Sequence, residues 1–422
     1  MAERRSLAQQ PQGGVYAWIA WSLGVLFAVF VFAVQTGYAV TSPRIGDSLG
    51  LSAAEIGLVA AFYTWMFAIF QVWAGGLLDI LGARRVITSA ILIVSAGVFV
   101  FAVSQSMAGL LVAQGMLAFG ACFGFVGAGF IGAGWFGVAQ FNVMFGLVQF
   151  FVSIVAAFHQ NVVSAALEHI GWRQLYVVLG SIGVGLAILF VVVFRDSQES
   201  RTDASAHAQR GTFWRTYFSG LLSVARTGRV WLAAISGGFT FSAVLALGVL
   251  LAPLVFLAHG ESVAASALGS SMVWVGLALG SLLLPPLSDR LRTRKWVIVG
   301  GVIGQLCAVL LLSVPSVQNV VALYAVAAFF GFCGAVVMIA FAAAADVVHP
   351  SHIGQASALA NAVMFIAGGV LLSLPGWIVA DRAWDERDLI FGLGPVVIAL
   401  VIALAVALLM RDTYPANGGR GD

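Results

Sequence analysis

Long apolar runs, separated by short polar stretches, follow one another along almost the whole chain. A helix rises about 1.5 Å per residue, so about 20 apolar residues cross a hydrocarbon layer of about 30 Å. Backbone groups in lipid must be paired within their own segment, and runs of this length are paired as helices. The pattern predicts twelve membrane-spanning helices, at residues 15–40, 53–78, 86–103, 110–136, 144–167, 175–194, 230–257, 264–284, 296–314, 320–344, 355–377 and 389–410.

One long polar stretch, residues 195–229, divides the predicted helices into two groups of six. Within it, residues 213–224 place aromatic and apolar side chains at helical spacing, which favours a helix that lies along the membrane surface. We therefore expect five parts, namely a tail at 1–14, an N-terminal half at 15–194, the linker at 195–229, a C-terminal half at 230–410 and a tail at 411–422.

Composition supports a lipid environment, because 61% of the 422 residues are hydrophobic and only 9% are charged. A soluble core cannot hide that much apolar surface, so the predicted fold class is an all-α integral membrane protein with two pseudo-symmetric six-helix halves. If the N-terminal tail is cytoplasmic, 16 of the 20 basic residues lie inside, and the outer segments hold only Arg44, Arg173, Arg382 and Arg387. This bias predicts that both termini are cytoplasmic, in a membrane of the bacterial inner-membrane type.

The connection between the second and third predicted helices carries a compact charged motif, Gly-Gly-Leu-Leu-Asp-Ile-Leu-Gly-Ala-Arg-Arg, at residues 75–85. Its glycines allow the backbone to turn tightly between two charged helix ends. A similar motif, Pro-Pro-Leu-Ser-Asp-Arg-Leu-Arg-Thr-Arg-Lys, occupies residues 285–295, and Asp289 follows Asp79 by 210 residues. A repeat at about half the chain length indicates two similar halves.

These two motifs resemble the signature loops of the major facilitator superfamily, which lie between helices two and three and between helices eight and nine. The resemblance implies two halves that rock about a central site. It also implies that the charged loops hold one state of an alternating-access cycle from the cytoplasmic side. By position, this conformational latch comprises Gly75, Gly76, Asp79, Arg84, Arg85, Asp289, Arg290 and Arg292. Pro285 stands where the superfamily pattern has a glycine.

Three short motifs resemble the monocarboxylate transporter and oxalate:formate antiporter group, namely Tyr16-Ala17-Trp18, Trp135-Phe136 and Gly171-Trp172-Arg173. That group has an arginine in helix eight to hold the substrate carboxylate and a lysine in helix eleven, and this sequence has neither. The drug:proton antiporters have a glycine-proline motif in helix five, which is absent here, and often an arginine in helix four, where this chain has Gln114. The substrate stays open between a monocarboxylate and a neutral, drug-like or cationic solute.

Every aspartate, glutamate, arginine and lysine falls in a predicted loop or at a helix end, and His159 lies within a predicted span. An ionisable residue at mid-membrane is a functional candidate by default. At 100° per residue, Gln149, Ser153, Gln160 and Ser164 form one polar stripe on the fifth helix, with His159 and Asn161 at its borders. One interpretation is that these groups bond neighbouring helices. The other is that the stripe faces an aqueous cavity, where His159 binds substrate or takes up a proton.

Smaller polar sets recur at helical spacing on other predicted helices, and together they could line one pathway. The candidate pathway residues are Gln35, Tyr38, Tyr63, Gln149, Ser153, His159, Gln160, Asn161, Thr240, Ser270, Trp274 and Asn361.

The sequence predicts a secondary active or facilitative transporter that moves a small organic solute by alternating access. The alternatives are an efflux transporter for a neutral, drug-like or cationic solute, and a transporter-like receptor or assembly factor that moves nothing. We expect no enzyme activity, cofactor, metal or nucleic acid, since no nucleotide-binding glycine loop, metal-ligand spacing or nucleophile–base pair occurs. The expected partners are membrane lipid and the solute, with protons as an alternative and the oligomeric state open.

Overall fold

The computed structural model describes residues 13–137, 140–196, 213–314, 319–349, 352–378 and 386–414. Within these residues, twelve helical stretches are long and apolar enough to cross a membrane, which confirms the predicted number. The N-terminal half contains α1 (Val15–Leu49), α2 (Ala53–Leu81), α3 (Ala83–Val103), α4 (Met107–Phe136), α5 (Phe141–His169) and α6 (Trp172–Val193). The linker contains α8 (Phe213–Arg226).

The C-terminal half builds two of its spans from more than one element. Gly228–Ala258 is a single span made of α9 (Gly228–Ala246), the π-helical turn η2 (Leu247–Leu251) and α10 (Ala252–Ala258). Val320–Asp346 is another, made of α13 (Val320–Gly334) and α14 (Val337–Asp346). The remaining spans are α11 (Val263–Leu291), α12 (Lys295–Leu312), α15 (Ile353–Ile378) and α16 (Glu386–Leu409).

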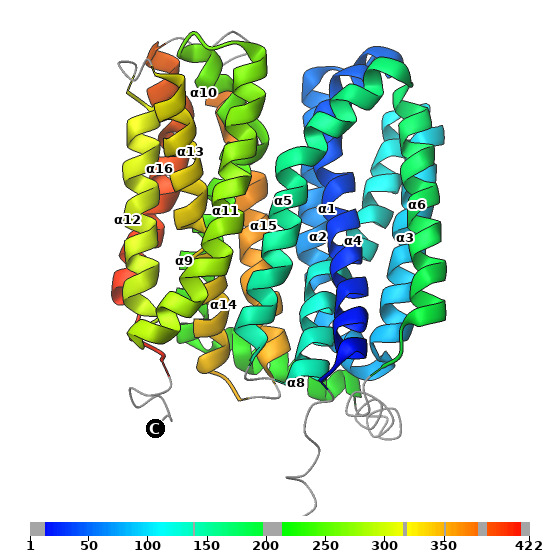
Figure 1. The fold of residues 1–422 in the computed structure, drawn as a ribbon, viewed down its shortest axis with the longest axis vertical. Helices are drawn as coiled ribbons and strands as arrows, with labels where there is room; N and C mark the ends of the chain where they lie inside the picture. The colour runs from blue at the N-terminus through cyan, green and yellow to red at the C-terminus, as the bar shows by residue number, and fades with distance from the viewer. Residues whose placement is uncertain are drawn as a thin grey trace, which may run out of the picture.

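The two halves stand side by side as separate bundles of roughly parallel helices (Figure 1). Between them, α2 packs against α15 and α5 packs against α11. The second span of each half thus contacts the fifth span of the other half, since α11 and α15 are the second and fifth spans of the C-terminal half. Two copies of a six-helix unit related by a two-fold axis would pack in this way.

One end of the molecule carries α8, the first residues of α1 and the described end of the chain after α16 (Figure 1). The α2–α3 and α11–α12 connections, which contain the two charged motifs, lie at the same end. We call it the hinge end, and we call the opposite end, where α1 turns into α2, the far end. At the far end, Gly50 closes α1 in a left-handed conformation with φ of 65°, and Ser52 forms a capping box with Glu55 at the start of α2.

α1 continues through Pro43 to Leu49, well past residue 40, where the first helix was predicted to end. Proline removes a backbone donor and normally ends or bends a helix. Here the last turns of α1 are held by packing, because Ile45 is fully buried and Ser48 Oγ accepts a 3.0 Å hydrogen bond from Trp172 Nε1 of α6. The Thr41 hydroxyl also donates to the carbonyl oxygen of Gly37, one turn earlier. Tertiary contacts therefore override the local signal of the proline.

Close contact between α11 and α13 depends on glycine in both helices. A Cβ on Gly276 would overlap the carbonyl oxygen of Ala328, and a Cβ on Gly331 would overlap that of Val273. Small residues let helix backbones approach in the way that packing within lipid favours.

Candidate solute pathway

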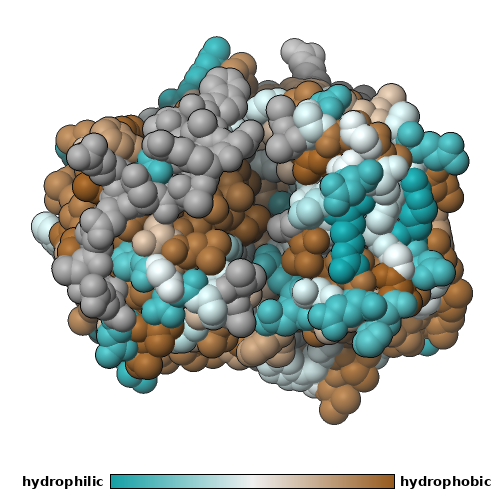
Figure 2. Space-filling view, turned by 90° about the horizontal axis from the view of Figure 1, so that it is seen from above, coloured by the Kyte–Doolittle hydropathy of each residue, from teal (hydrophilic) through white to brown (hydrophobic). Residues whose placement is uncertain are grey.

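A cavity of about 800 Å³ lies between the two halves. The N-terminal half contributes side chains from α1, α2, α3, α4 and α6, and the C-terminal half contributes side chains from α9, η2 and α15. The cavity reaches Gly57 and Leu58, near the far-end start of α2, and Thr64 and Trp65 farther along the helix. Seen from above, the molecule is hollowed between the two halves (Figure 2).

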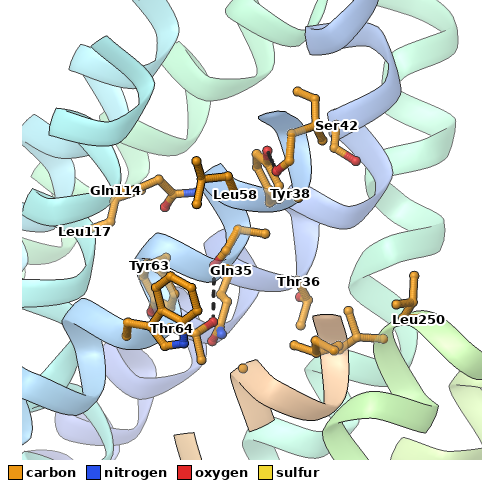
Figure 3. A pocket seen from close by; sticks show the side chains of 18 of the residues that line it. Gln35, Thr36, Tyr38, Ser42, Leu58, Tyr63, Thr64, Gln114, Leu117 and Leu250 are labelled. Carbon is orange, nitrogen blue, oxygen red and sulfur yellow. Dashed lines mark hydrogen bonds between the residues drawn. The ribbon is translucent and has the colours of Figure 1, made fainter. Parts of the chain in front are cut away.

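The described lining of this cavity contains no Asp, Glu, Lys or Arg. Its polar groups are hydroxyls, amides and an indole, set among apolar and aromatic side chains (Figure 3). They belong to Gln35, Thr36, Tyr38, Ser42, Tyr63, Thr64, Trp65, Gln114, Tyr176 and Ser373.

Several of these hydroxyl groups already donate their proton to backbone carbonyl groups. Thr36 Oγ1 donates to Phe32 O over 2.9 Å, and Thr64 Oγ1 donates to Ala60 O over 3.2 Å. The Tyr38 hydroxyl donates to Ile56 O over 2.9 Å, and Ser373 Oγ donates to Gly369 O over 2.8 Å. Each of these oxygen atoms keeps lone pairs that can accept a further hydrogen bond.

The far-end side of the cavity is built on an aromatic stack. The ring of Phe101 lies 4.5 Å from that of Tyr176, centroid to centroid, with an interplanar angle of 22°. Tyr38 meets the edge of Phe101 at 6.0 Å. The Tyr176 hydroxyl lies 3.1 Å from Thr41 Oγ1, whose own proton goes to the backbone of α1, so Tyr176 is the donor. This network fixes the rings of α1, α3 and α6 relative to one another.

The structure brings only some of the candidate pathway residues to the cavity. Gln35, Tyr38 and Tyr63 line it. Gln149 Nε2 donates to Ser153 Oγ over 2.9 Å within α5, and Trp274 Nε1 donates to Gly248 O over 3.1 Å. The other candidates outside the lining are His159, Gln160, Asn161, Thr240, Ser270 and Asn361.

His159 lies where α5 faces α1. A Cβ built on Gly37 of α1 would lie 3.2 Å from His159 Nε2. The imidazole also interacts with the backbone of Ala33, while Nε2 is buried and has no hydrogen-bond partner among the described residues. Asn161 and Ser164, in contrast, are exposed on the surface of α5. The predicted stripe therefore divides into a buried part and an exposed part.

Sequence reasoning did not select Thr36, Thr64, Trp65, Tyr176 or Ser373, all of which line the cavity. Hydroxyl and aromatic residues are common in apolar helices, so their type alone gave no signal. Gln114 was visible as an amide inside a strongly apolar run, and it is 4% exposed and lines the cavity from α4. An isolated amide of this kind was the one signal that could have extended the candidate set.

Aromatic contacts join the two halves toward the hinge end. The Phe125 and Phe145 rings, from α4 and α5, pack at 5.1 Å, and each lies within 6.4 Å of the Phe341 ring in α14. Nearby, α5 approaches α11 so closely that a Cβ on Gly146 would come within 2.7 Å of the carbonyl oxygen of Ser281. These contacts hold the two halves together toward the hinge end.

The first charged motif binds within its own half. The backbone N–H of Arg84 donates to Asp196 Oδ1 over 2.9 Å, and Arg84 Nη2 donates to Val191 O over 2.7 Å, so α3 is tied to the end of α6. Arg85 is exposed. A Cβ on Gly76 would lie 2.5 Å from the ring of Tyr217 in α8. The side chain of Asp79 and the surroundings of Gly75 lie outside the described part of the chain.

In the second motif, the arginine paired with Asp289 is Arg294, which was not among the predicted latch residues. Arg294 Nη1 lies 2.7 Å from Asp289 Oδ1, and Nε lies 3.4 Å from Asp346 Oδ2 at the end of α14. The Arg294 side chain is 6% exposed. Arg290 is exposed, and Arg292 ends α11 in the left-handed region with φ of 52°.

Each half has an aspartate just after its last span. This aspartate accepts a hydrogen bond from a backbone N–H at the start of the helix next to the charged motif. Asp412 Oδ1 accepts from the backbone N–H of Arg294 over 3.0 Å, as Asp196 does from Arg84. Thr293 Oγ1 also donates to Asp412. Partial burial acts to raise the pKa of Asp412, but these hydrogen bonds outweigh it and hold the pKa below its usual value. Both aspartates follow an arginine, as Arg195-Asp196 and Arg411-Asp412, which is a second trace of the duplication.

Comparison with known proteins agrees with this architecture. The sequence profile described as Major Facilitator Superfamily matches residues 23–271 and 246–421. A protein of Cupriavidus necator named "Probable sulfoacetate transporter SauU" is 24% identical over 186 residues, which cover 44% of this chain and 43% of that protein. A protein of Escherichia coli named "Probable L-galactonate transporter" is 25% identical over 189 residues, which cover 43% of this chain and 40% of that protein. Each match spans less than half the length of the relative. Because the profile covers nearly the whole chain, the protein belongs to the Major Facilitator Superfamily.

Proposed function

We propose that this protein moves a small polar organic solute across a membrane by alternating access, as a secondary active or facilitative transporter. The observation that carries the proposal is the cavity of about 800 Å³ between the halves, to which both halves contribute lining residues. The aromatic contacts among Phe125, Phe145 and Phe341 join the halves toward the hinge end, and in this proposal they close the cavity on that side. Rocking of one half against the other would open those contacts and close the far end.

The class of solute is supported by the relatives. Their names describe probable transporters of sulfoacetate and L-galactonate, both of which are small organic carboxylates. A monocarboxylate is therefore a second candidate for this protein. A carboxylate in the cavity would have no arginine or lysine among the described lining residues to pair with. Hydrogen bonds to it would come chiefly from the amides of Gln35 and Gln114 and the indole of Trp65.

The charge distribution supports an orientation for the cycle. The basic residues gathered in the tails, the linker and the two charged motifs support a cytoplasmic position for the hinge end. In this proposal the described state is open toward the outside of a bacterial-type inner membrane. Asp79 and Arg84 serve as latch residues in this proposal, and Asp79→Asn would slow transport with a modest effect on solute affinity.

Reconstituted transport and cysteine labelling together test the proposal. In a variant lacking Cys122, Cys307 and Cys333, Leu58→Cys reports on the far-end mouth and Phe145→Cys on the hinge-end closure. Addition of a transported solute should change maleimide labelling at these two sites in opposite directions, and proteoliposomes should exchange that solute. A protein that binds a solute but shows neither exchange nor any change in labelling would instead be a transporter-like receptor.

A further inference from the structure

The hydrogen-bonding character of the cavity wall identifies the class of solute. We infer that the cavity binds an uncharged solute rich in hydroxyl or amide groups. Gln35 and Gln114 form hydrogen bonds with these groups, and the hydroxyl oxygens of the lining accept hydrogen bonds from them. The inference rests on the proposed function and narrows it. Three features of the lining support the inference. Its hydroxyl groups already donate their protons to backbone carbonyl groups, its amides lie beside the cavity, and none of its described residues is charged.

The wall oxygens of Thr36, Tyr38, Thr64 and Ser373 are acceptors toward the cavity, because each has given its proton to a backbone carbonyl group. A carboxylate or sulfonate has no proton to donate, so its oxygen atoms would meet lone pairs on these surfaces. A hydroxyl or amide of a solute can donate to the same oxygens at no cost to the protein. The wall therefore favours solutes with many donors and disfavours anions.

Most hydrogen-bond donors of the site belong to neutral amide and hydroxyl groups, which can also accept hydrogen bonds. Gln35 projects from α1 and Gln114 from α4, and both amides lie among the side chains that surround the cavity (Figure 3). An amide offers two donors and one acceptor oxygen, which suits a hydroxyl group that both donates and accepts. The Tyr63 hydroxyl adds one further group, since the side chain is 5% exposed and its oxygen has no hydrogen-bond partner among the described residues.

A charged solute would also lack a counter-charge in this site. None of the described lining residues is ionised at neutral pH, and much of the remaining wall is apolar, as at Leu58, Leu117 and Leu250. Moving an unpaired charge from water into such surroundings is costly. Aromatic faces can attract a cation, and the stack of Phe101 on Tyr176 covers only one face of each of these two rings. The cationic analogue is therefore tested beside the anionic one. An uncharged solute avoids this cost while still using the amides and acceptor oxygens.

Three probes with one carbon skeleton separate the alternatives: galactitol, which is neutral, galactonate, which is anionic, and 1-amino-1-deoxygalactitol, which is cationic. Each is tested by the thermal shift of the purified full-length protein, since a ligand that binds only the folded state raises its apparent stability. Counterflow in proteoliposomes then tests transport. A neutral trio of glycerol, myo-inositol and acetamide extends the range of size. At least one neutral solute should bind at tenfold lower concentration than both charged galactitol analogues and should exchange.

Substitutions test the solute-binding roles of Gln35 and Gln114. Gln114→Leu and Gln35→Leu should each weaken binding of the neutral solute at least fivefold, while Gln105→Leu, the same change at an exposed site outside this cavity, should not. Gln114→Glu introduces a carboxylate and should shift preference toward the amino analogue. Tighter binding and exchange of galactonate or of the amino analogue by the unaltered protein would overturn the inference and leave the transport proposal intact. Absence of any exchange, with these probes and with sulfoacetate, would overturn both.

Discussion

The ring of Tyr217 in the linker helix α8 lies directly over Gly76 of α2, so that a Cβ on Gly76 would come within 2.5 Å of Tyr217 Cε2. The Tyr217 hydroxyl donates to Val72 O in α2, and Gln355 Nε2 of α15 donates to Tyr217 O over 3.2 Å. One residue of the linker thus binds both halves at the hinge end. Gly76, which was predicted as a latch residue, leaves the space that the aromatic ring of Tyr217 occupies.

Gly76→Ala should displace α8 and weaken this bridge. Overpacking of a tight contact typically costs about 1–3 kcal/mol, so we expect a lower thermal midpoint and a changed transport rate. Gly185→Ala in α6 is the matched control, because a Cβ there meets nothing within 4 Å and alanine is favoured over glycine in a helix. If both variants behaved alike in thermal unfolding and in transport, the close contact between Gly76 and the Tyr217 ring would not stabilise the protein.

Arg294 should matter more for stability than the neighbouring arginines of its motif. Its side chain is 6% exposed and pairs with Asp289, which is 42% exposed, and with Asp346, which is 19% exposed. Arg294→Ala should cost an amount between the about 1 kcal/mol of a surface pair and the roughly 3–5 kcal/mol of a broken buried pair. Arg290→Ala, at an exposed position, should cost much less. Equal losses in thermal unfolding would show that the ion pairs do not stabilise the hinge end.

Asp412 gives a pH dependence with a defined sign. Its pKa is held below the usual value by hydrogen bonds that outweigh its burial, so the folded state binds this proton less readily than the unfolded state. The resulting stabilisation is complete above the unfolded-state pKa of about 3.9 and is lost as the pH falls through the folded-state pKa. Asp412→Ala should lower stability by about 1 kcal/mol at neutral pH, as loss of a helix cap does, and the difference from the unaltered protein should shrink in acid. A constant difference between pH 7 and pH 3 would assign the effect to packing alone.

The apolar runs were enough to predict twelve spans, because the length of a helix in lipid is set by the hydrocarbon thickness and every run met it. They could not predict the continuation of α1 beyond Pro43, which depends on contacts of Ile45 and Ser48 with distant helices. Helical periodicity likewise placed Gln149 and Ser153 on one face of α5 without showing what that face meets. In the structure they bond to each other, and α5 contributes none of the described residues that line the cavity.

The pairing of Asp289 illustrates the same limit in the charged motif. The superfamily resemblance assigned the latch to Arg290 and Arg292 by their position in the motif, and it left Arg294 out. Arg292 closes α11 with a positive φ, and the turn that follows brings Arg294 back over Asp289 and toward Asp346. The backbone turn after α11 and the position of Asp346 in α14 therefore decide which arginine pairs with Asp289. The local sequence pattern contains neither kind of information.

His159 is the ionisable residue whose position in α5 makes it a candidate for proton coupling. Its Nε2 is buried against Gly37 of α1 and has no hydrogen-bond partner among the described residues. An imidazole changes charge in the range of about pH 5–8, and a charge created between α5 and α1 would favour separation of these helices. If transport is proton-coupled, the change in packing at this contact is a direct way for a proton to bias the two halves.

We therefore predict that His159→Ala flattens the pH dependence of uptake between about pH 5 and pH 8 while leaving binding in the cavity largely unchanged, since His159 does not line it. His169→Ala, which alters an exposed histidine at the end of the same helix, is the matched control. The measurement is initial uptake by proteoliposomes across this pH range, with thermal shift at each pH to follow solute binding. Retention of the full pH dependence by His159→Ala would place proton uptake elsewhere, and the contact with α1 would then be one of packing only.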